Sequence, residues 1–461
     1  MLDHSTPIIV IGAGVFGLST AYHLALKGYK NITVLDEQDH PSHLYSPDNG
    51  SRSASADINK IFRASYGEQV HYQELAYEAQ SIWLEWDEQI SRSRPGELPA
   101  GLEPEDKLVH LCGLLRLSGT GELSAHELAT LGNFDLAGHR ERQFSLQDPG
   151  DRERALADPE WKDRFCVFGD PAFPSGKGKG MAGVLDSTAG YVLMDKACLW
   201  MWDLCIKQGV KFSSGNQGKV LRFLTTKAEG EKEKEKVVGV LTAEGEREAG
   251  LVVVATGAYT PLLLLQSRAC ATATAGTLVT LQLPPSRPDL WARFDPKRFP
   301  AVIWGSGERS GLYILPRMRD GKLKFGYRGT KFTNLLPDQE QQQQQQASTP
   351  VYPSQVPELA TRMVTSTIAE LLPELQGVPV QSSRLCWYTD GPENEFLVDY
   401  VPGFEGLVVA TCGSGHAAKH MPVLGKYVVG IIERRGTPYT AFWKWKDGGA
   451  RPRNVVDLKD A

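Results

Sequence analysis

The spacing of three glycines near the N-terminus predicts a binding site for a dinucleotide. Gly12, Gly14 and Gly17 follow a run of apolar, mostly β-branched residues at 8–11. In such a turn the first glycine permits the tight bend, the second lets a pyrophosphate approach the backbone, and the third lets a helix pack on the strand. Asp36 follows Gly17 by 19 residues, where a carboxylate accepts a hydrogen bond from a ribose hydroxyl. Asp36 argues against a 2′-phosphate, but the pattern does not separate NAD from FAD.

Strands and helices must alternate to position this turn. A helix over 18–27 and a strand over 31–35 complete the first unit, and an α/β fold with a parallel sheet follows from that alternation. Further strands are expected at 108–117, 210–212, 219–224, 237–242, 251–255, 277–283, 311–315, 322–327, 385–390 and 407–410, and further helices at 69–90, 195–209, 358–372 and 423–433. The tail after residue 433 is polar, and we expect it to be irregular.

The sequence pattern typical of a nucleotide-binding domain is interrupted twice along the chain. It predicts a Rossmann-type nucleotide-binding domain built from 1–90, 183–259 and 381–461. A mixed-sheet substrate domain is expected from 91–182 and 260–380. The charged run at 227–236 is expected to be a solvated hairpin tip. The glutamine-rich run at 339–347 is expected to be a surface insertion.

Composition excludes several classes of protein. The chain has 461 residues, of which 41% are hydrophobic and 23% charged, as in an ordinary globular protein. A net charge of −5 does not indicate the basic surface that binds nucleic acid. No apolar run is long enough to span a bilayer, and we expect no membrane partner. Seven cysteines without paired CxxC spacing suggest reduced thiols and an intracellular protein, either cytoplasmic or peroxisomal. No secretory signal is visible, and the C-terminus lacks the Ser-Lys-Leu address.

Five later motifs, together with the glycine turn and Asp36, give the chain a family resemblance from end to end. The motifs lie at 55–67 (SADINKIFRASYG), 255–261 (ATGAYTP), 323–327 (LKFGY), 386–390 (CWYTD) and 413–419 (GSGHAAK). With them the chain resembles the FAD-dependent amine oxidases. That family includes monomeric sarcosine oxidase, the fungal fructosyl-amino-acid oxidases (amadoriases) and the fungal L-pipecolate and L-saccharopine oxidases. The resemblance implies an FAD-binding domain at the glycine turn and a flavin oxidase.

The resemblance also implies that the sulfur of Cys386 is bonded to the 8-methyl carbon of the flavin. A thiolate can attack that electron-poor carbon, and it needs a basic setting to ionise. Arg384 lies two residues upstream and could supply one. The alternative is an inert buried cysteine.

Two lysines are implied to lie beside the flavin ring. Lys324 is implied to face the N5 side, where a fixed positive charge stabilises the superoxide formed when O₂ takes its first electron. The alternative is that Lys324 lies on the solvent-exposed face of a strand. Lys60 resembles the amadoriase and saccharopine oxidase pattern, where sarcosine oxidase has arginine. A structural salt bridge is an equal alternative for Lys60.

Arg63 and Lys419 are the expected substrate anchors. A carboxylate needs a planar bidentate donor, which arginine supplies, and a second cation assists. Each could instead be an ordinary surface cation. The resemblance implies further cofactor contacts, namely Val15, Phe16, Ser55, Lys60, Val220, Gly257, Gly413, Gly415, His416 and Lys419.

No metal site is expected. His416 and His420 have helical i, i+4 spacing, but they lack the glutamate of His-Glu-x-x-His and a third ligand. His40 and His43 lie around a proline and make no stronger case.

These residues predict a flavin oxidase of secondary amines, such as N-methyl, cyclic or otherwise N-substituted amino acids. The oxidised carbon lies next to nitrogen, O₂ is reduced to hydrogen peroxide, and an imine is hydrolysed or cyclises. The alternatives are a fructosyl-amino-acid oxidase, a flavin dehydrogenase that uses another acceptor, and a non-catalytic flavin protein. The expected partners are a small amino acid or amine and O₂, and the expected state is a monomer.

Overall fold

The computed structural model describes residues 2–94, 96–169, 181–228, 234–336, 347–352, 355–446, 448 and 454–460. Most of the glutamine-rich run at 339–347 and the centre of the charged run at 227–236 lie outside these residues.

A mostly parallel sheet carries the glycine turn. Within the described residues its order is β19-β21-β13-β1-β2-β9, and only β19 runs antiparallel to its neighbour. The strands are β1 (Ile8–Ile11), β2 (Ile32–Leu35), β9 (Lys211–Ser213), β13 (Leu251–Val254), β19 (Leu397–Tyr400) and β21 (Leu407–Thr411). The central strands β1, β13 and β21 are buried throughout, as expected for a parallel sheet with both faces covered.

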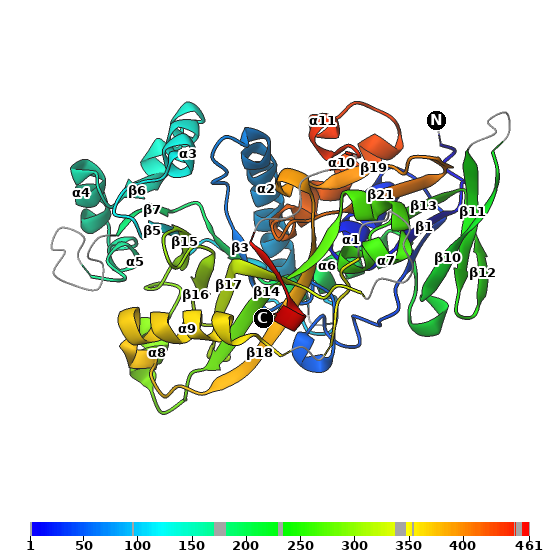
Figure 1. Cartoon of the computed structure of the whole chain (residues 1–461). Helices are drawn as coiled ribbons and strands as arrows, with labels where there is room; N and C mark the ends of the chain where they lie inside the picture. Colours follow the sequence, from blue (N-terminus) through cyan, green and yellow to red (C-terminus); the bar gives the residue numbers. More distant parts are fainter. Residues whose placement is uncertain are drawn as a thin grey trace.

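Alternate side chains of these strands enter two different cores. Ile8 and Val10 face the helices α1 (Val15–Leu26), α6 (Met194–Lys207) and α10 (Met421–Ile432). Ile9 and Ile11 pack on the other face against Val237 and Val240. The period of two places successive residues on opposite faces, which produces three layers (Figure 1).

A smaller sheet forms the third layer. It contains β10 (Val220–Lys227), β11 (Glu235–Thr242) and β12 (Gly245–Glu248), and the short β20 (Phe404–Glu405) pairs with β11. The two strands that flank the charged run, β10 and β11, are antiparallel, which agrees with the expected hairpin.

A larger mixed sheet forms the other half of the molecule (Figure 1). Its order within the described residues is β18-β14-β17-β16-β15-β5-β7-β6, with β22 paired to β17. Its strands are β5 (Leu114–Ser118), β6 (Gln143–Ser145), β7 (Ala182–Asp186), β14 (Thr272–Gln282), β15 (Ala301–Ser306), β16 (Leu312–Leu315), β17 (Lys322–Thr333), β18 (Val380–Asp390) and β22 (Val455–Asp457). The helices α8 (Pro288–Arg293) and α9 (Glu358–Leu371) cover it, while α3 (Ala125–Leu136), α4 (Pro149–Ala157) and α5 (Lys162–Phe165) lie near β5–β7.

A small sheet and one long helix connect the two halves. The strands β3 (Lys60–Phe62), β8 (Gly190–Val192) and β4 (Val109–His110) pair antiparallel. The helix α2 (Val70–Arg92) lies between the halves (Figure 1). The indole N–H of Trp83 donates to the backbone carbonyl of Lys419 at 2.7 Å. The short helices α7 (Thr260–Leu263) and α11 (Thr440–Trp443) flank the parallel sheet.

Two departures from the sequence expectations concern the strands. The strand expected over 108–117 is two strands, β4 and β5, because Gly113 between them has a φ of +83°. The expectation of an irregular tail was wrong for residues 455–457. They form β22, which pairs in parallel with residues 331–333 of β17. A distant strand edge supplies those hydrogen bonds. The five-segment division of the domains stays a proposal, although β18 and β22 pair in the mixed sheet.

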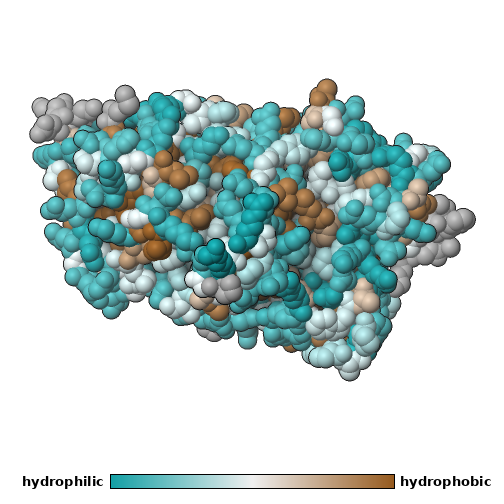
Figure 2. Space-filling view, turned by 180° about the vertical axis from the view of Figure 1, so that it is seen from behind, coloured by the Kyte–Doolittle hydropathy of each residue, from teal (hydrophilic) through white to brown (hydrophobic). Residues whose placement is uncertain are grey.

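Among the described residues, no helix combines the length and apolar character needed to cross a membrane. Figure 2 shows brown apolar areas set among larger hydrophilic ones on the face opposite that of Figure 1.

Candidate active site

The glycine turn has the close contacts that its spacing predicted. Gly12 has a φ of +105°, and a Cβ there would lie 2.5 Å from the carbonyl oxygen of Ala255. A Cβ at Gly17 would lie 1.8 Å from the carbonyl oxygen of Gly12. Gly14 is the N-cap of α1 and has no side chain to cap it, so the first turn of the helix keeps N–H groups for an anion.

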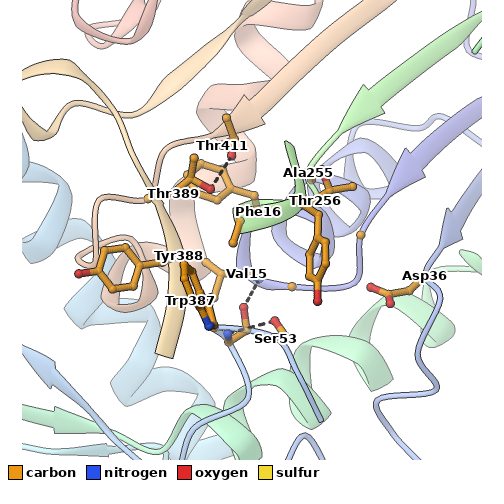
Figure 3. A pocket seen from close by; sticks show the side chains of 18 of the residues that line it. Val15, Phe16, Asp36, Ser53, Ala255, Thr256, Trp387, Tyr388, Thr389 and Thr411 are labelled. Atoms are coloured by element: carbon orange, nitrogen blue, oxygen red, sulfur yellow. Dashed lines mark hydrogen bonds between the residues drawn. The ribbon is translucent and has the colours of Figure 1, made fainter. Parts of the chain in front are cut away.

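A cavity of about 480 Å³ begins at this turn. Figure 3 shows Asp36 on one side of the cavity and Trp387 and Tyr388 on the other, with Val15 and Phe16 between them. The cavity wall includes nearly all the expected cofactor contacts, namely Gly12, Gly14, Val15, Phe16, Asp36, Ser55, Lys60, Val220, Gly257, Cys386, Gly413, Gly415 and His416. Gly17 and Lys419 are not among the residues of that wall.

Asp36 and Ser55 organise the entrance of the turn. The Asp36 carboxylate accepts from the backbone N–H of Ala13 at 2.8 Å and of Gln38 at 2.9 Å. Burial alone would raise the pKa of Asp36, but the His40 hydrogen bond and charge and these amides outweigh it and lower the pKa. Ser55 Oγ accepts from the N–H of Val15 at 2.9 Å. An ionised Asp36 retains acceptor capacity for a ribose hydroxyl.

Asp57 is a residue that the sequence analysis did not assign. One of its carboxylate oxygens accepts from Lys60 Nζ at 2.8 Å and from Lys324 Nζ at 3.0 Å, and the other lies 3.3 Å from Arg384. Burial alone would raise the pKa of Asp57, but these three cations hold it well below its usual range. Its position three residues before Lys60 was the only signal in the sequence.

Lys324 is almost completely buried, so the solvated-face alternative is wrong. It donates to Asp57 and to the carbonyl oxygen of Asn59. Burial lowers the pKa of Lys324 to about 8, with Asp57 opposing and Lys60 adding to the shift. Lys324 lines a second, small cavity, and Lys60 lines the main one. Asp57 therefore joins the two lysines.

Cys386 lies on the wall of the main cavity and is buried. The charges of Lys60 and Arg384 both interact with its thiol. The basic setting expected from Arg384 is therefore present, and Lys60 adds to it. Cys386 is not part of a disulfide.

Tyr66 brings the two expected substrate anchors together. The guanidinium of Arg63 lies 4.5 Å from the centre of the Tyr66 ring. Lys419 Nζ donates to the Tyr66 hydroxyl at 2.8 Å and to the carbonyl oxygen of His416 at 2.7 Å. Burial, followed by the charge of Arg63, lowers the pKa of Lys419 well below its usual range. Within the described residues, Arg63 makes no hydrogen bond or ion pair.

His416 and His420 share the Tyr66 hydroxyl at 3.1 Å each. Burial, followed by the charge of Lys419, lowers the pKa of both rings. A neutral His416 must donate from Nε2 to the carbonyl oxygen of Asn394, 2.8 Å away, so its Nδ1 accepts from Tyr66. The described residues contain no group of three or more His, Cys, Asp or Glu side chains suited to a metal.

Arg328 is a second residue that the sequence analysis did not assign. It lies on β17 one residue beyond the expected strand at 322–327, and its Nε–H donates to the Tyr388 hydroxyl at 2.9 Å. Tyr388 lines the main cavity. No local pattern marks Arg328, because its position depends on the packing of three separate segments.

The fold and this cavity define a dinucleotide-binding oxidoreductase, and comparison with known proteins identifies its family. Residues 7–431 match the model of the FAD dependent oxidoreductase (DAO) family. The chain belongs to this family, which confirms the resemblance and the flavin.

Relatives and a solved structure agree over nearly the whole chain. It is 26% identical to L-saccharopine oxidase of Schizosaccharomyces pombe, over 99% of this chain and 98% of that protein. It is 26% identical to the peroxisomal sarcosine oxidase of Homo sapiens, over 91% and 90%. The structure of fructosyl peptide oxidase from E. terrenum superposes with a TM-score of 0.78 at 23% identity, covering 100% and 98%, which shows a shared fold.

The residues present fit FAD. The glycine cradle would be filled by any Cβ at Gly12, and the helix N-terminus that follows suits a diphosphate. Asp36 would hold the ribose, and Lys60 and Cys386 lie on the wall of the same cavity. When bound, the flavin supplies the redox chemistry, accepting a hydride equivalent from a substrate.

Proposed function

We propose that this protein oxidises secondary amines that carry a carboxylate, taking N-substituted or cyclic amino acids as substrates and O₂ as the electron acceptor. The observation that supports the proposal most strongly is the pair of cations on Tyr66. Arg63 has an unpaired guanidinium within the described residues, and Lys419 shares its aromatic partner. The names of the relatives, an L-saccharopine oxidase and a sarcosine oxidase, support the same substrate class.

Arg63 and Lys419 would hold the substrate carboxylate. A guanidinium donates two parallel N–H groups to a carboxylate, and an ammonium adds a third donor. The positive charge on this side also favours a substrate amine that reacts in its neutral form. Burial lowers the pKa of Arg63 and of Lys419, so an anionic ligand would offset part of the cost of burying the two charges.

Lys324 would supply the positive charge that O₂ needs when it accepts the first electron. Its amino group is held by Asp57 and the carbonyl of Asn59 rather than by solvent. A charge fixed before the reaction needs no reorganisation when negative charge develops.

We also propose that the flavin is covalently attached through Cys386. Cys386 lies on the wall of the main cavity, and two cations, Lys60 and Arg384, are its electrostatic neighbours there. Acid precipitation tests this proposal, since a covalent flavin stays with the pellet. The variant Cys386→Ala should release the yellow colour to the supernatant, and Cys412→Ala, at another buried thiol, should not. A wild-type supernatant that is yellow would disprove the attachment.

The decisive experiment is a screen of secondary amino acids that measures hydrogen peroxide, followed by anaerobic reduction with the best substrate. Each substrate is compared with its carboxamide. The wild type should prefer the carboxylate by about 10–100-fold in kcat/KM, the value of hydrogen bonds to a charged group. Arg63→Met should remove most of this preference.

Three outcomes would redirect the proposal. Activity confined to fructosyl amino acids would favour the deglycating alternative. Substrate bleaching without peroxide would indicate a dehydrogenase, and no bleaching by any amine would indicate a non-catalytic flavin protein. We further propose a monomer and an intracellular location, cytoplasmic or peroxisomal, in keeping with the peroxisomal relative.

A further inference from the structure

A short stretch of chain, the strip of residues 52–55, lies directly against the glycine turn and belongs to the wall of the main cavity. Ser55 Oγ accepts from the N–H of Val15 at 2.9 Å, and the N–H of Ser55 donates to Ser53 Oγ at 3.1 Å. A Cβ at Gly14 would lie 2.9 Å from Ser55 Oγ and 3.5 Å from Ser53 Oγ. Figure 3 shows Ser53 close to Val15. The strip therefore borders the helix N-terminus that suits the diphosphate of FAD.

The outer end of the strip, Arg52, is held through its backbone on two sides. Its N–H donates to Gln38 Oε1 at 2.7 Å, and the N–H of Gln38 donates to the Asp36 carboxylate at 2.9 Å. Its carbonyl oxygen accepts from the hydroxyl of Tyr352 at 2.8 Å. The first bond ties the strip to the residue expected to hold the ribose. The second ties it to a residue 300 positions further along the chain.

Tyr352 reaches the strip from the other half of the molecule. Val351 and Tyr352 pack against the core of the larger mixed sheet. Just before them, Ser348 is 2% exposed and pairs with Leu335 in an antiparallel bridge. The tyrosine is therefore anchored on the mixed sheet, and its hydroxyl connects that sheet to the nucleotide-binding half.

The ring of Tyr352 lies near the cavity without forming part of its wall. The guanidinium of Arg52 lies 6.0 Å from the centre of the ring. Tyr259 and Cys386, which are both on the cavity wall, are electrostatic neighbours of the hydroxyl. Tyr352 itself is not among the described residues of that wall. Any effect of its hydroxyl on the cofactor must therefore pass through the strip.

We propose that Tyr352 is a positioning residue for FAD, because its hydrogen bond holds the 52–55 strip against the glycine turn and slows the dissociation of the cofactor. A segment that is ordered before its ligand binds avoids the cost of ordering it at that moment. Without the hydroxyl, the outer end of the strip keeps only the bond to Gln38 on its backbone. This role concerns the cofactor and is independent of which amine the protein oxidises.

The test is the rate of FAD release from Tyr352→Phe, which loses the hydroxyl and keeps the ring that packs on the mixed sheet. The parent is flavin-loaded Cys386→Ala, so that no thioether can retain the cofactor. Release is followed after dilution as the rise in flavin fluorescence. Tyr352→Phe should raise the release rate constant by about 3–10-fold, the value of one hydrogen bond. The Kd for FAD should rise by the same factor.

Tyr400→Phe in the same parent is the matched control. The Tyr400 hydroxyl also donates to a backbone carbonyl, that of Ile432 at 2.7 Å, and the guanidinium of Arg434 lies 4.2 Å from the centre of its ring. Tyr400 is not among the described residues that line either cavity. Its variant should lower the temperature of thermal unfolding and leave the release rate of FAD unchanged.

A purely structural role for Tyr352 has a different outcome. In that case Tyr352→Phe lowers the unfolding temperature as Tyr400→Phe does, while FAD release stays within about twofold of the parent, below the value of one hydrogen bond. That result would overturn the inference.

Amide hydrogen exchange on the flavin-loaded parent gives a second test that needs no variant at Tyr352. The N–H groups of Arg52 and Ser55 bond to side chains rather than to a helix or sheet, so their protection reports how firmly the strip is held. Both should exchange slowly. Exchange at the rate of an unprotected amide would overturn the role of Tyr352 even if Tyr352→Phe does not fold. Neither test measures turnover, so a failure of the proposed amine oxidation would leave both results standing.

Discussion

Replacement of Asp57 by asparagine should cost the protein several kilocalories per mole of stability. One carboxylate oxygen of Asp57 accepts from Lys60 and Lys324, and the other faces Arg384. Asparagine has the same shape but one oxygen and one NH₂ group. Whichever way its amide turns, the NH₂ group faces a cation. Three buried or half-buried positive charges then have no counter-charge at this position.

The size of the effect follows from burial. The Asp57 and Lys324 side chains are 3% and 1% exposed, so water cannot replace the lost partner. Removing one member of a buried pair typically costs about 3–5 kcal/mol, a large part of a total stability of about 5–15 kcal/mol. The control is Asp48→Asn, because Asp48 is 45% exposed and pairs with Lys322 at 3.1 Å. A surface pair of this kind contributes about 0–1 kcal/mol.

The stability that Asp57→Asn loses relative to wild type, here called the deficit, should depend on pH in a defined direction. The folded pKa of Asp57 is depressed, so its contribution is complete above the unfolded value of about 3.9 and is lost as the pH falls through the folded value. The Asp57 charge supports a pKa of about 8 for Lys324, and the variant should lower that value further. A folded state that binds fewer protons gains stability as pH rises. The deficit should therefore be widest near pH 5–6 and narrow toward about pH 8.

The assay is chemical unfolding of wild type, Asp57→Asn and Asp48→Asn, all loaded with flavin at the same free FAD concentration because bound ligand adds stability. Unfolding free energies are compared from pH 5 to 8. An Asp57→Asn protein within about 1 kcal/mol of wild type at pH 6, the range of a surface pair, would refute the reasoning. So would a deficit that grows with pH.

Three further outcomes are expected. The rate constant for O₂ with the reduced protein should fall as pH rises through about 8, where Lys324 loses its proton, and Lys324→Met should be slower and lack this inflection; a wild-type rate independent of pH would contradict the role of that charge. Gly17→Ala should lower the stability by about 1–3 kcal/mol in thermal unfolding, because the new Cβ would lie 1.8 Å from the Gly12 carbonyl oxygen. An increase in stability, as helix propensity alone predicts, would show that the helix can shift. Tyr66→Phe should cost about 1–3 kcal/mol in chemical unfolding, since it leaves buried polar groups unpaired, among them one hydrogen bond of Lys419; unchanged stability would mean that water replaces the hydroxyl.

Local chemistry made the nucleotide half of the molecule predictable. The glycine turn, its helix and the acidic residue after the second strand lie within 36 residues, and each is required by the backbone geometry of its neighbours. The helix expected over 18–27 begins three residues earlier, at Val15, because the turn passes directly into α1. Most of the expected cofactor contacts from distant motifs also line the cavity, whereas Lys419 does not. That result depended on the family resemblance, since no local rule connects Val220 or Cys386 to Gly12.

The charges at the site were decided by tertiary structure. Lys324 and Asp57 are separated by 267 residues, and the burial of Lys324 depends on which face of β17 it occupies. The pairing of Lys324 with Thr280 on one side and Leu315 on the other sets that face, and a shift of one residue would reverse it. The alternating pattern at 322–327 shows a strand, but it does not show which side is buried.

The contacts of Arg328 and Tyr66 also join parts of the chain that are far apart in the sequence. Arg328 is held by side-chain and backbone groups 60 to 87 residues away, and Tyr66 meets Lys419 across 353 residues. By itself, the sequence determined the elements, the nucleotide turn and the types of residue available for chemistry, because steric and hydrogen-bonding preferences act between near neighbours. Only the tertiary structure decided which cations share a carboxylate, which share an aromatic ring and which remain unpaired, because electrostatic partners are set by sheet register and by burial.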